Sequence, residues 1–520
     1  MIVRAPEPPI DIPDIALTPF LLESAADRGD KAAFIDGPSG RTLTYAGWAE
    51  AVRRTAAGLH RRGFRQGDVF AIYSPNLPEY AVAFHAVSLL GGINTTINPT
   101  YTASELATQL QDAGARHLVT VPAFLDKARQ AARECGMGEV FVFGEAEGAT
   151  PFASLLEDGE VPRVAIDPRE DVVVLPYSSG TTGLPKGVML THRNLVANIL
   201  QTASAVSGLE GTDTVLGLLP FFHIYGMVVI MNLALHRGAT VVTLPRFDLE
   251  QCLQTLQRYR ITFANVVPPL VLALAKQKVV EDYDLSSLHT LFSGAAPLGE
   301  PVASAAAARL GCRVIQGYGL TETSPVTHAT RAGAARVKVA GIGPPIPNTE
   351  AKVVDLATGV DLGPSQEGEI CVRGPQVMKG YLNRPEATAA MIDGEGWLHT
   401  GDVGYADEEG CFFVVDRVKE LIKYKGLQVA PAELEAVLLA HPAVADAAVV
   451  PLPDEEAGEV PKAFVVLKGE ATPEAIMAFV AERVAPYKKV RRLEVTDQIP
   501  KSPSGKILRR VLIERGQART

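Results

Sequence analysis

The sequence predicts an α/β protein: a large N-terminal domain with doubly covered parallel sheets plus a small β-barrel-like part, and a small mobile α+β C-terminal domain. Three observations support this prediction. Up to about residue 350, short apolar runs alternate with amphipathic segments, which is typical of parallel strands covered by helices on both faces. The following strands are short and lack long helices between them, which favours an antiparallel or barrel-like piece. Beyond Asp416, helices and strands mix again in a short segment.

The first two thirds of the chain contain the clearest alternation. Residues 30–145 include an expected helix at 45–62 and an expected strand at 69–73. The sequence from Asp248 to Gln251 has the form of a capping box that opens a helix. Further strands are expected at 172–177, 240–244, 261–267, 289–292 and 313–316, and further helices at 195–206, 248–259, 270–279 and 301–310.

The last third divides into two parts. Short strands are expected at 351–355, 368–372 and 411–415. The final unit has expected helices at 432–439, 473–484 and 507–514, and expected strands at 443–450, 463–467 and 492–495. We therefore place a boundary between two domains, residues 1–416 and 417–520, with a hinge near Lys419.

The charge is acidic overall and unevenly distributed. The 520 residues include 49 Lys or Arg and 59 Asp or Glu, for a net charge of −10. A net acidic chain is a poor candidate for coating nucleic acid, because neutralisation of phosphates drives that binding. The segment 483–520 is the exception, with eleven Lys or Arg against three Asp or Glu.

Cysteine use and hydropathy indicate a cytoplasmic protein. The five cysteines are far apart and form no CxxC pair, which argues against a disulfide framework and against a zinc site. The first residues are rich in proline and acids and do not have the form of a signal peptide. The most apolar stretch, 225–235, is about half as long as a membrane helix, so we expect no membrane insertion.

A run of small and hydroxyl residues follows the strand expected at 172–177. Its glycines let backbone N–H groups approach phosphate oxygens, its hydroxyls add donors, and Lys186 supplies a mobile positive charge. It is not a Walker loop, because Pro185 and Gly187 stand where that motif needs Gly and Ser or Thr. A flexible surface turn is the alternative, but eleven ordered residues of this type make it the weaker one. The candidate phosphate-binding residues are Ser178, Ser179, Gly180, Thr181, Thr182, Gly183 and Lys186.

Other motifs have the chemistry of a nucleotide site. Two glycines at the end of the strand near Gln316 let a flat base lie against the backbone, with Tyr318 available to stack. Glu322 is a hard oxygen ligand suited to Mg²⁺, or else a solvated surface acid. The Asp402 carboxylate can accept hydrogen bonds from both ribose hydroxyls, or else it caps a turn. The guanidinium of Arg417 can donate several hydrogen bonds to ribose or phosphate, or else it forms a structural ion pair.

Two further residues each have an ordinary structural explanation. His223 stands in an apolar setting, where a histidine is more often part of the core. Lys506 follows Gly505 at an expected helix start, where a lysine is normally solvated. The prolines around it, Pro500 and Pro503, make its loop distinctive.

Taken together, these motifs resemble those of the adenylate-forming superfamily, which includes acyl-CoA synthetases, coumarate–CoA ligases, beetle luciferases and peptide-synthetase adenylation domains. The matches follow the family's order from about residue 45 to 510 and are closest to 4-coumarate–CoA ligase. They are the phosphate loop 178–188, the adenine and magnesium motif 316–322, a box at 368–374 associated with coumarate–CoA ligases, the ribose motif 397–402, the hinge 416–426 and the lysine loop 500–507.

The resemblance implies ATP, Mg²⁺ and coenzyme A, and a reaction in two steps. A carboxylate attacks the α-phosphate of ATP to give acyl-AMP and pyrophosphate, and a thiol then displaces AMP. Lys506 would bridge the carboxylate and the α-phosphate, and His223 would orient the acid. The small domain would rotate about Lys419 between the steps. Lys423 and Gln428 would serve adenylation, and Lys425 and Gly426 would line the thiol channel.

The resemblance also carries the remaining site residues. The nucleotide site would include Gln316, Gly317, Tyr318, Thr321, Asp402 and Arg417, with Glu322 as the metal ligand. The acyl pocket would be lined by Tyr225, Ser293, Gly294, Ala295, Gly317, Pro325 and Val326. Many of these residues are small, which leaves room for a flat aromatic acid or a medium alkyl chain.

The leading hypothesis is an ATP-dependent acid–thiol ligase acting on 4-coumarate or another cinnamate-type acid. A medium-chain fatty acyl-CoA ligase, a carrier-protein-loading enzyme and a non-catalytic nucleotide binder remain alternatives. A luciferase-type oxygenase is disfavoured by the pair Phe222-His223. The partners are small molecules, the acid is left open, and the chain is either a monomer or a homodimer.

Overall fold

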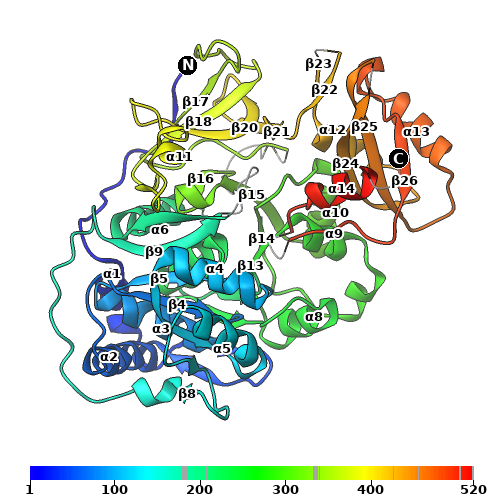
Figure 1. The fold of residues 1–520 in the computed structure, drawn as a ribbon. Helices are drawn as coiled ribbons and strands as arrows, with labels where there is room; N and C mark the ends of the chain where they lie inside the picture. The colour runs from blue at the N-terminus through cyan, green and yellow to red at the C-terminus, as the bar shows by residue number, and fades with distance from the viewer. Residues whose placement is uncertain are drawn as a thin grey trace.

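The computed structural model describes residues 1–178, 185–206, 208–331, 338, 340–425, 427–454, 456–502 and 505–517. The chain builds three sheets in a large N-terminal part and a fourth in a smaller unit at the C-terminus, seen at the right of Figure 1. The predicted α/β class, with its separate C-terminal unit, is confirmed.

The first sheet is mainly parallel and carries the N-terminal side of the site. Its order is β19-β10-β9-β5-β4-β6-β7-β8, and β10 turns back antiparallel to β9. Its strands are β4 (Val69–Tyr73), β5 (Ile93–Thr96), β6 (Ala115–Thr120), β7 (Phe141–Val142), β8 (Thr150–Pro151), β9 (Val172–Ser178), β10 (Lys186–Thr191) and β19 (Gly380–Tyr381). The neighbouring helices are α2 (Tyr45–Arg61), α3 (Pro78–Leu89), α4 (Ala103–Ala113), α5 (Leu125–Glu134) and α6 (His192–Ala205).

The second sheet has parallel central strands and antiparallel edges. Its order is β16-β15-β14-β13-β11-β12-β2-β3. The strands are β2 (Ala32–Asp36), β3 (Thr42–Thr44), β11 (Thr214–Gly217), β12 (Thr240–Thr243), β13 (Phe263–Val266), β14 (Thr290–Ser293), β15 (Arg313–Gly319) and β16 (Val326–Ala329). The helices are α1 (Leu17–Ala25), a π-helix (Tyr225–Asn232), α7 (Leu233–Arg237), α8 (Leu249–Arg258), α9 (Pro268–Lys276) and α10 (Glu300–Leu310).

One continuous apolar core joins these two sheets. It includes Phe70 of β4, Phe84 of α3, Val228 of the π-helix and Phe263 of β13, each at most 1 % exposed. The apolar stretch that includes the π-helix is therefore core. None of the helices in the described residues combines the length and apolar character that a membrane-spanning helix needs.

The expected barrel-like part is an antiparallel sheet in the order β1-β17-β18-β20-β21. Its elements are β1 (Val3–Arg4), β17 (Glu350–Val354), β18 (Gly368–Arg373), α11 (Pro385–Ala389), β20 (Leu398–Ala406) and β21 (Phe412–Arg417). Strand β20 was not expected from the sequence, and the motif that contains Asp402 lies inside it.

The small C-terminal unit packs its helices on a four-strand path, β23-β22-β25-β24, with β26 parallel to β25. Its elements are β22 (Ile422–Tyr424), β23 (Leu427–Val429), α12 (Pro431–Leu439), β24 (Val444–Asp454), β25 (Gly458–Leu467), α13 (Pro473–Ala481), β26 (Arg492–Val495) and α14 (Arg509–Gln517). Helix α14 begins two residues later than expected, because Lys501 and Ile507 pair as an isolated β-bridge before it.

Candidate active site

The two ends of the phosphate-binding run are held side by side. Ser178 ends β9 and Lys186 begins β10, and the two residues are antiparallel partners. The intervening Ser179, Gly180, Thr181, Thr182 and Gly183 lie outside the described residues. The Lys186 ammonium lies 4.6 Å from the ring centroid of Tyr381, a cation–π contact that holds the charge at the mouth of the run.

Glu322 is the acid at this end of the site. It lies in a short 3₁₀ turn, Thr321–Thr323, directly after β15, and is 6 % exposed. Its Oε1 accepts hydrogen bonds from Ser178 Oγ at 2.9 Å and from the Tyr381 hydroxyl at 2.8 Å. Among the described residues no hydrogen bond reaches Oε2. A fixed carboxylate with one oxygen left for a ligand beside a phosphate-binding run fits Mg²⁺.

Tyr381 was missed by the sequence analysis. It contacts both Lys186 and Glu322, and thus connects the two charged groups expected at the phosphates. Burial and the Glu322 carboxylate raise the pKa of Tyr381, so its hydroxyl stays a donor at neutral pH. Nothing in its sequence surroundings marks it, because β19 is only two residues long.

The adenine motif closes the end of β15. The side-chain amide of Gln316 pairs with the backbone of Leu298: Oε1 accepts from its N–H at 3.3 Å and Nε2 donates to its carbonyl at 3.2 Å. A side chain at Gly317 would approach the Phe292 ring to 2.6 Å, so only glycine leaves that ring in place. Thr321 follows at the start of the 3₁₀ turn, next to Glu322.

The ribose motif forms a three-residue cluster. The Tyr318 hydroxyl donates to Asp402 Oδ2 at 2.6 Å, and Arg417 Nε lies 3.2 Å from Asp402 Oδ1. Asp402 is 5 % exposed. Burial raises the pKa of Asp402, while Arg417, Tyr318 and Lys506 act in the opposite direction. The structure thus brings together Tyr318, Asp402 and Arg417, three residues from separate motifs. These three residues are called the nucleotide cluster below.

Lys506 lies within electrostatic reach of this cluster, and its backbone is held by hydrogen bonds to Ser502. Ser502 N–H donates to the Lys506 carbonyl at 2.8 Å, and the Lys506 N–H donates to Ser502 Oγ at 3.1 Å. The loop rests on the large part of the chain, since a side chain at Gly505 would lie 3.2 Å from Val267. Burial and the nearby Arg417 lower the pKa of Lys506, while Asp402 and Glu322 oppose that change. The ammonium therefore lies within electrostatic reach of the groups expected at ribose and metal.

His223 also lies within electrostatic reach of Lys506. Burial and the Lys506 charge lower the pKa of His223 to about 3, so its imidazole is neutral. Its Nδ1 accepts the backbone N–H of Tyr225 at 3.3 Å. Because Nδ1 accepts, the ring proton is on Nε2, which can donate to a carboxylate.

The candidate acyl pocket begins at Tyr225. This ring is buried, and its hydroxyl donates to the carbonyl of Phe292 at 2.7 Å, which fixes it against the end of β14. A side chain at Gly294 would lie 3.0 Å from the Tyr225 ring. Ser293 Oγ is buried without a hydrogen-bond partner among the described residues. The next residue after Gly294, Ala295, has a positive φ of 69°.

Pro325 and Val326 complete the expected pocket at the turn between β15 and β16. The carbonyl of Pro325 accepts the Thr323 hydroxyl at 2.5 Å, and Val326 N–H donates to Asn198 of α6 at 3.1 Å. Both bonds fix the backbone, and the Val326 side chain packs in the apolar core. The residues of the expected pocket therefore come from β14, β15, β16 and the π-helix.

The β22–β23 hairpin of the small unit contains two residues expected to serve adenylation, Lys423 and Gln428, and two expected at the thiol channel, Lys425 and Gly426. Lys423 is exposed, and the Lys425 ammonium lies 2.5 Å from Glu456 Oε1. Figure 1 shows this hairpin at the outer end of the small unit, while α14 lies next to α9 and α10. Gly426 and the side chain of Gln428 lie outside the described residues. The structure thus brings Lys506 to the nucleotide cluster, with Lys423 and Lys425 on a different face.

Comparison with known proteins agrees with this geometry. Residues 21–382 match the AMP-binding enzyme family, and residues 433–506 match the AMP-binding enzyme C-terminal domain. The chain is 44 % identical to 4-coumarate–CoA ligase 2 of Petroselinum crispum, over 98 % of this chain and 96 % of that protein.

Solved structures give the same result for the fold. The anthranilate CoA ligase AuaEII in complex with anthranoyl-AMP matches with a TM-score of 0.90 at 27 % identity, covering 98 % of this chain and 99 % of that one. ATP-bound MatB from Rhodopseudomonas palustris matches with a TM-score of 0.88 at 28 % identity, covering 97 % and 99 %.

The chain therefore belongs to the AMP-binding enzyme family of adenylate-forming enzymes. Within that family it is an AMP-forming acid–CoA ligase, similar over nearly its whole length to the 4-coumarate–CoA ligases. Such a ligase uses ATP, Mg²⁺ and coenzyme A.

Proposed function

We propose that the chain joins 4-coumarate, or another cinnamate-type aromatic acid, to coenzyme A. The observation that carries this proposal is the wall that Tyr225 and Gly294 form together: the ring packs directly on the glycine, so that even a Cβ at Gly294 would lie 3.0 Å from it. A flat wall that contains a fixed aromatic ring suits a planar aromatic acid better than a flexible alkyl chain. The relatives named 4-coumarate–CoA ligase support a cinnamate-type acid, and the anthranoyl-AMP bound by AuaEII supports an aromatic acid more generally.

The side chains divide the first step between them. Nε2–H of neutral His223 would orient the acid's carboxylate, and the Lys506 ammonium would neutralise charge between that carboxylate and the α-phosphate of ATP. Lys186 would neutralise the departing pyrophosphate. Glu322 would hold Mg²⁺, which supplies positive charge at the phosphates when bound. Asp402 and Arg417 would hold the ribose.

The second step would require a different face of the small domain. We keep the domain boundary at 416/417 and the hinge at Lys419 as parts of the proposal. The β22–β23 hairpin lies away from the nucleotide cluster while Lys506 occupies it, so a rotation would have to bring Lys425 and Gly426 to the thiol. Lys423 and Gln428, which belong to the same hairpin, are kept as residues that would serve adenylation.

Pyrophosphate release with a panel of cinnamates, benzoates and fatty acids, with and without CoA, tests the substrate class. We expect turnover with cinnamates and formation of the CoA thioester. Turnover with medium-chain fatty acids alone would replace the proposal with the fatty acyl alternative. Release that never passes to CoA would favour a carrier-protein thiol, and no release with any acid would contradict a catalytic role.

A matched pair of glycine variants tests the wall that Tyr225 and Gly294 form. Gly294→Ala places a methyl group 3.0 Å from the Tyr225 ring, so we expect a large rise in KM for the cinnamate and little change in KM for ATP. Gly299→Ala is the control, because its nearest contact would be Pro301 at 3.8 Å. Equal behaviour of the two variants would show that Gly294 does not line the acid site.

A further inference from the structure

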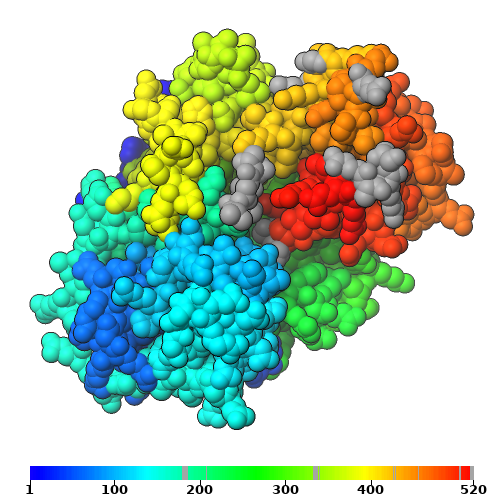
Figure 2. Space-filling view, viewed as in Figure 1, coloured from blue at the N-terminus to red at the C-terminus, as the bar shows by residue number. Residues whose placement is uncertain are grey.

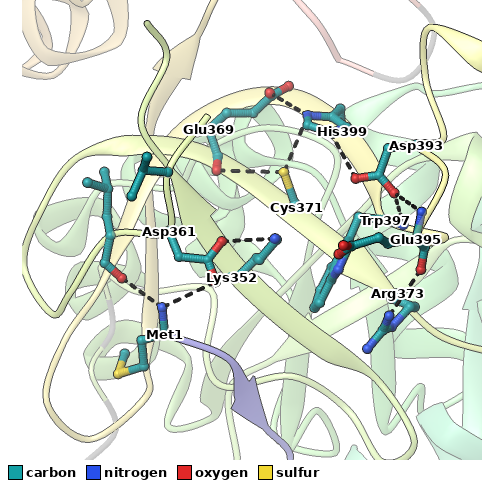
Figure 3. A network of polar contacts seen from close by, with 12 residues as sticks. Met1, Lys352, Asp361, Glu369, Cys371, Arg373, Asp393, Glu395, Trp397 and His399 are labelled. Atoms are coloured by element: carbon teal, nitrogen blue, oxygen red, sulfur yellow. Dashed lines mark hydrogen bonds and ion pairs between the residues drawn. The ribbon is translucent and has the colours of Figure 1, made fainter. Parts of the chain in front are cut away.

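A sulfur, a nitrogen and a carboxylate oxygen meet between two strands of the antiparallel sheet, at Glu369 and Cys371 of β18 and His399 of β20 (Figure 3). His399 Nδ1 lies 2.8 Å from Glu369 Oε2 and 3.5 Å from Cys371 Sγ. The three candidate ligand atoms all lie within 4.8 Å of one another. Within the described residues this is the one such group of three.

The pairing of the strands explains this arrangement. Residues two apart on a strand face the same side of a sheet, so Glu369 and Cys371 project together. Cys371 pairs directly with His399, which places the imidazole opposite the thiol. Cysteine spacing along the chain gave no hint of it, because two of the three groups are not cysteines and the histidine is 28 residues away.

The ligand types and their spacing fit zinc. Zn²⁺ binds Cys sulfur at about 2.3 Å and His nitrogen at about 2.0–2.1 Å, usually with tetrahedral geometry. These bond lengths place a tetrahedral S···N pair about 3.5 Å apart. That is the separation between Cys371 Sγ and His399 Nδ1. A small movement of the Glu369 carboxylate from its hydrogen bond would admit the ion.

The surrounding groups already hold the candidate ligands in place. Asp393 Oδ2 lies 3.6 Å from His399 Nε2, the nitrogen that would keep its proton when Nδ1 binds a metal. Asp393 is itself fixed, because its Oδ1 accepts the backbone N–H groups of Glu395 and Trp397, each at 2.9 Å. The other Glu369 oxygen, Oε1, accepts the N–H of Gly401 at 2.9 Å. A carboxylate behind a metal-binding histidine is the usual outer partner in zinc sites.

We propose that Cys371, His399 and Glu369 bind one zinc ion, with water in the fourth position. The thiol gives up its proton to the solvent on binding, so sulfur coordinates as thiolate. His399 is partly exposed, with 35 % of its side chain accessible, which provides a path for the ion. The site is separate from the Mg²⁺ position at Glu322 and differs from it in chemistry, because thiolate and imidazole ligands select Zn²⁺ over Mg²⁺.

Metal analysis after equilibrium dialysis against Zn²⁺ with excess Mg²⁺ tests the proposal on the full chain. We expect wild-type protein to retain one equivalent of zinc. Cys371→Ser and His399→Gln should bind zinc at least about tenfold more weakly and lose it during dialysis. Cys411→Ser is the matched control, since it is another buried cysteine of the same sheet region, and it should keep the equivalent. Failure of the wild type to retain zinc, or equal retention by all variants, would overturn the proposal.

Cobalt substitution keeps the test decisive if a variant does not fold. Co²⁺ bound to the wild type should show the absorption of a tetrahedral ion and a thiolate-to-metal charge-transfer band. The band should disappear in Cys371→Ser and persist in Cys411→Ser. A Co²⁺ complex of the wild type without the thiolate-to-metal charge-transfer band would exclude Cys371 as a ligand and overturn the proposed site.

Discussion

The charged side chains of the candidate active site are held in place by contacts within the chain itself. Asp402 already contacts Tyr318 and Arg417, and Glu322 already accepts two hydroxyl hydrogen bonds. Lys506 lies near this set, in surroundings that lower its pKa. Fixed charges that need not reorganise during reaction contribute most to stabilising a transition state.

Replacing Lys506 tests the assigned charge directly. Lys506→Ala removes the ammonium that we propose to lie near the α-phosphate, and we expect adenylate formation to slow by about 10²-fold or more, the effect of deleting one preorganised donor. The measurement is pyrophosphate release in the absence of CoA. Lys468→Ala, an exposed lysine of the same unit, is the control and should leave the rate unchanged. Unchanged adenylation by Lys506→Ala would remove this residue from the mechanism.

Tyr381 allows a test of how Glu322 is positioned. Tyr381→Phe keeps the ring beside Lys186 but loses the hydrogen bond to the Glu322 carboxylate. A hydrogen bond to a charged group contributes about 1.5–3 kcal/mol of stabilisation. We expect the apparent KM for Mg·ATP to rise about tenfold or more, with a steeper dependence on Mg²⁺ concentration. Tyr405→Phe, which keeps its stacking on Phe413, is the matched control. If the two variants have the same KM, Tyr381 does not position Glu322.

At the scale of elements, strand β21 is tied to helix α12 by one carboxylate. Asp416 Oδ2 accepts the N–H of Ala432 in the first turn of α12 at 2.9 Å, and Oδ1 accepts the N–H of Arg417 at 2.7 Å. This bond joins the last strand of the large part to the first helix of the small one. Burial raises the pKa of Asp416 from its ordinary 3.8 to about 6.

The raised pKa of Asp416 predicts a pH dependence of stability. Between about pH 4 and 6 the Asp416 carboxyl is ionised in the unfolded chain but still protonated in the folded chain. The free energy of unfolding that this proton contributes is therefore fully present below pH 4 and is lost as the pH rises through 6. The loss is about 3 kcal/mol. Melting temperatures from pH 4 to 8 should show that the wild type loses stability relative to Asp416→Asn across this window.

The matched control for that comparison is Asp497→Asn, which changes an exposed aspartate. Its melting curve should follow the wild type at every pH. A constant difference between wild type and Asp416→Asn from pH 4 to 8 would mean that Asp416 titrates as it does in the unfolded chain. A difference that grows in the opposite direction would contradict the raised pKa.

Local patterning predicted the elements better than their contacts. Apolar runs and caps placed the strands near residues 172 and 313 and the helix capped by Asp248, because these signals act over a few residues. Tyr381 and His399 could not be assigned in this way. Their partners, Glu322 and Cys371, are brought to them by sheet pairing over long sequence separations.

At the scale of the whole molecule, the basic segment has a structural use that its charge count did not reveal. Lys488 pairs with Glu433, Lys501 with Asp446, and Arg509 with Glu420 and Glu435. Much of its positive charge is thus neutralised inside the small unit. Figure 2 shows this red segment packed against the green part of the large one. A side chain at Gly505, next to Lys506, would lie 3.2 Å from Val267 of the large part.

Because one small unit presents Lys506 and the β22–β23 hairpin on different faces, the two half-reactions should be separable by mutation. Lys425 pairs with Glu456 in this arrangement and not with the nucleotide cluster. Lys425→Ala should therefore leave pyrophosphate release unchanged while raising the KM for CoA, whereas Lys506→Ala should slow the first step. Single-turnover assays of acyl-AMP formation and of its transfer to CoA measure the two steps separately. A Lys425→Ala variant that slowed acyl-AMP formation as much as transfer would show that one arrangement serves both steps, and the proposed rotation about Lys419 would then be unnecessary.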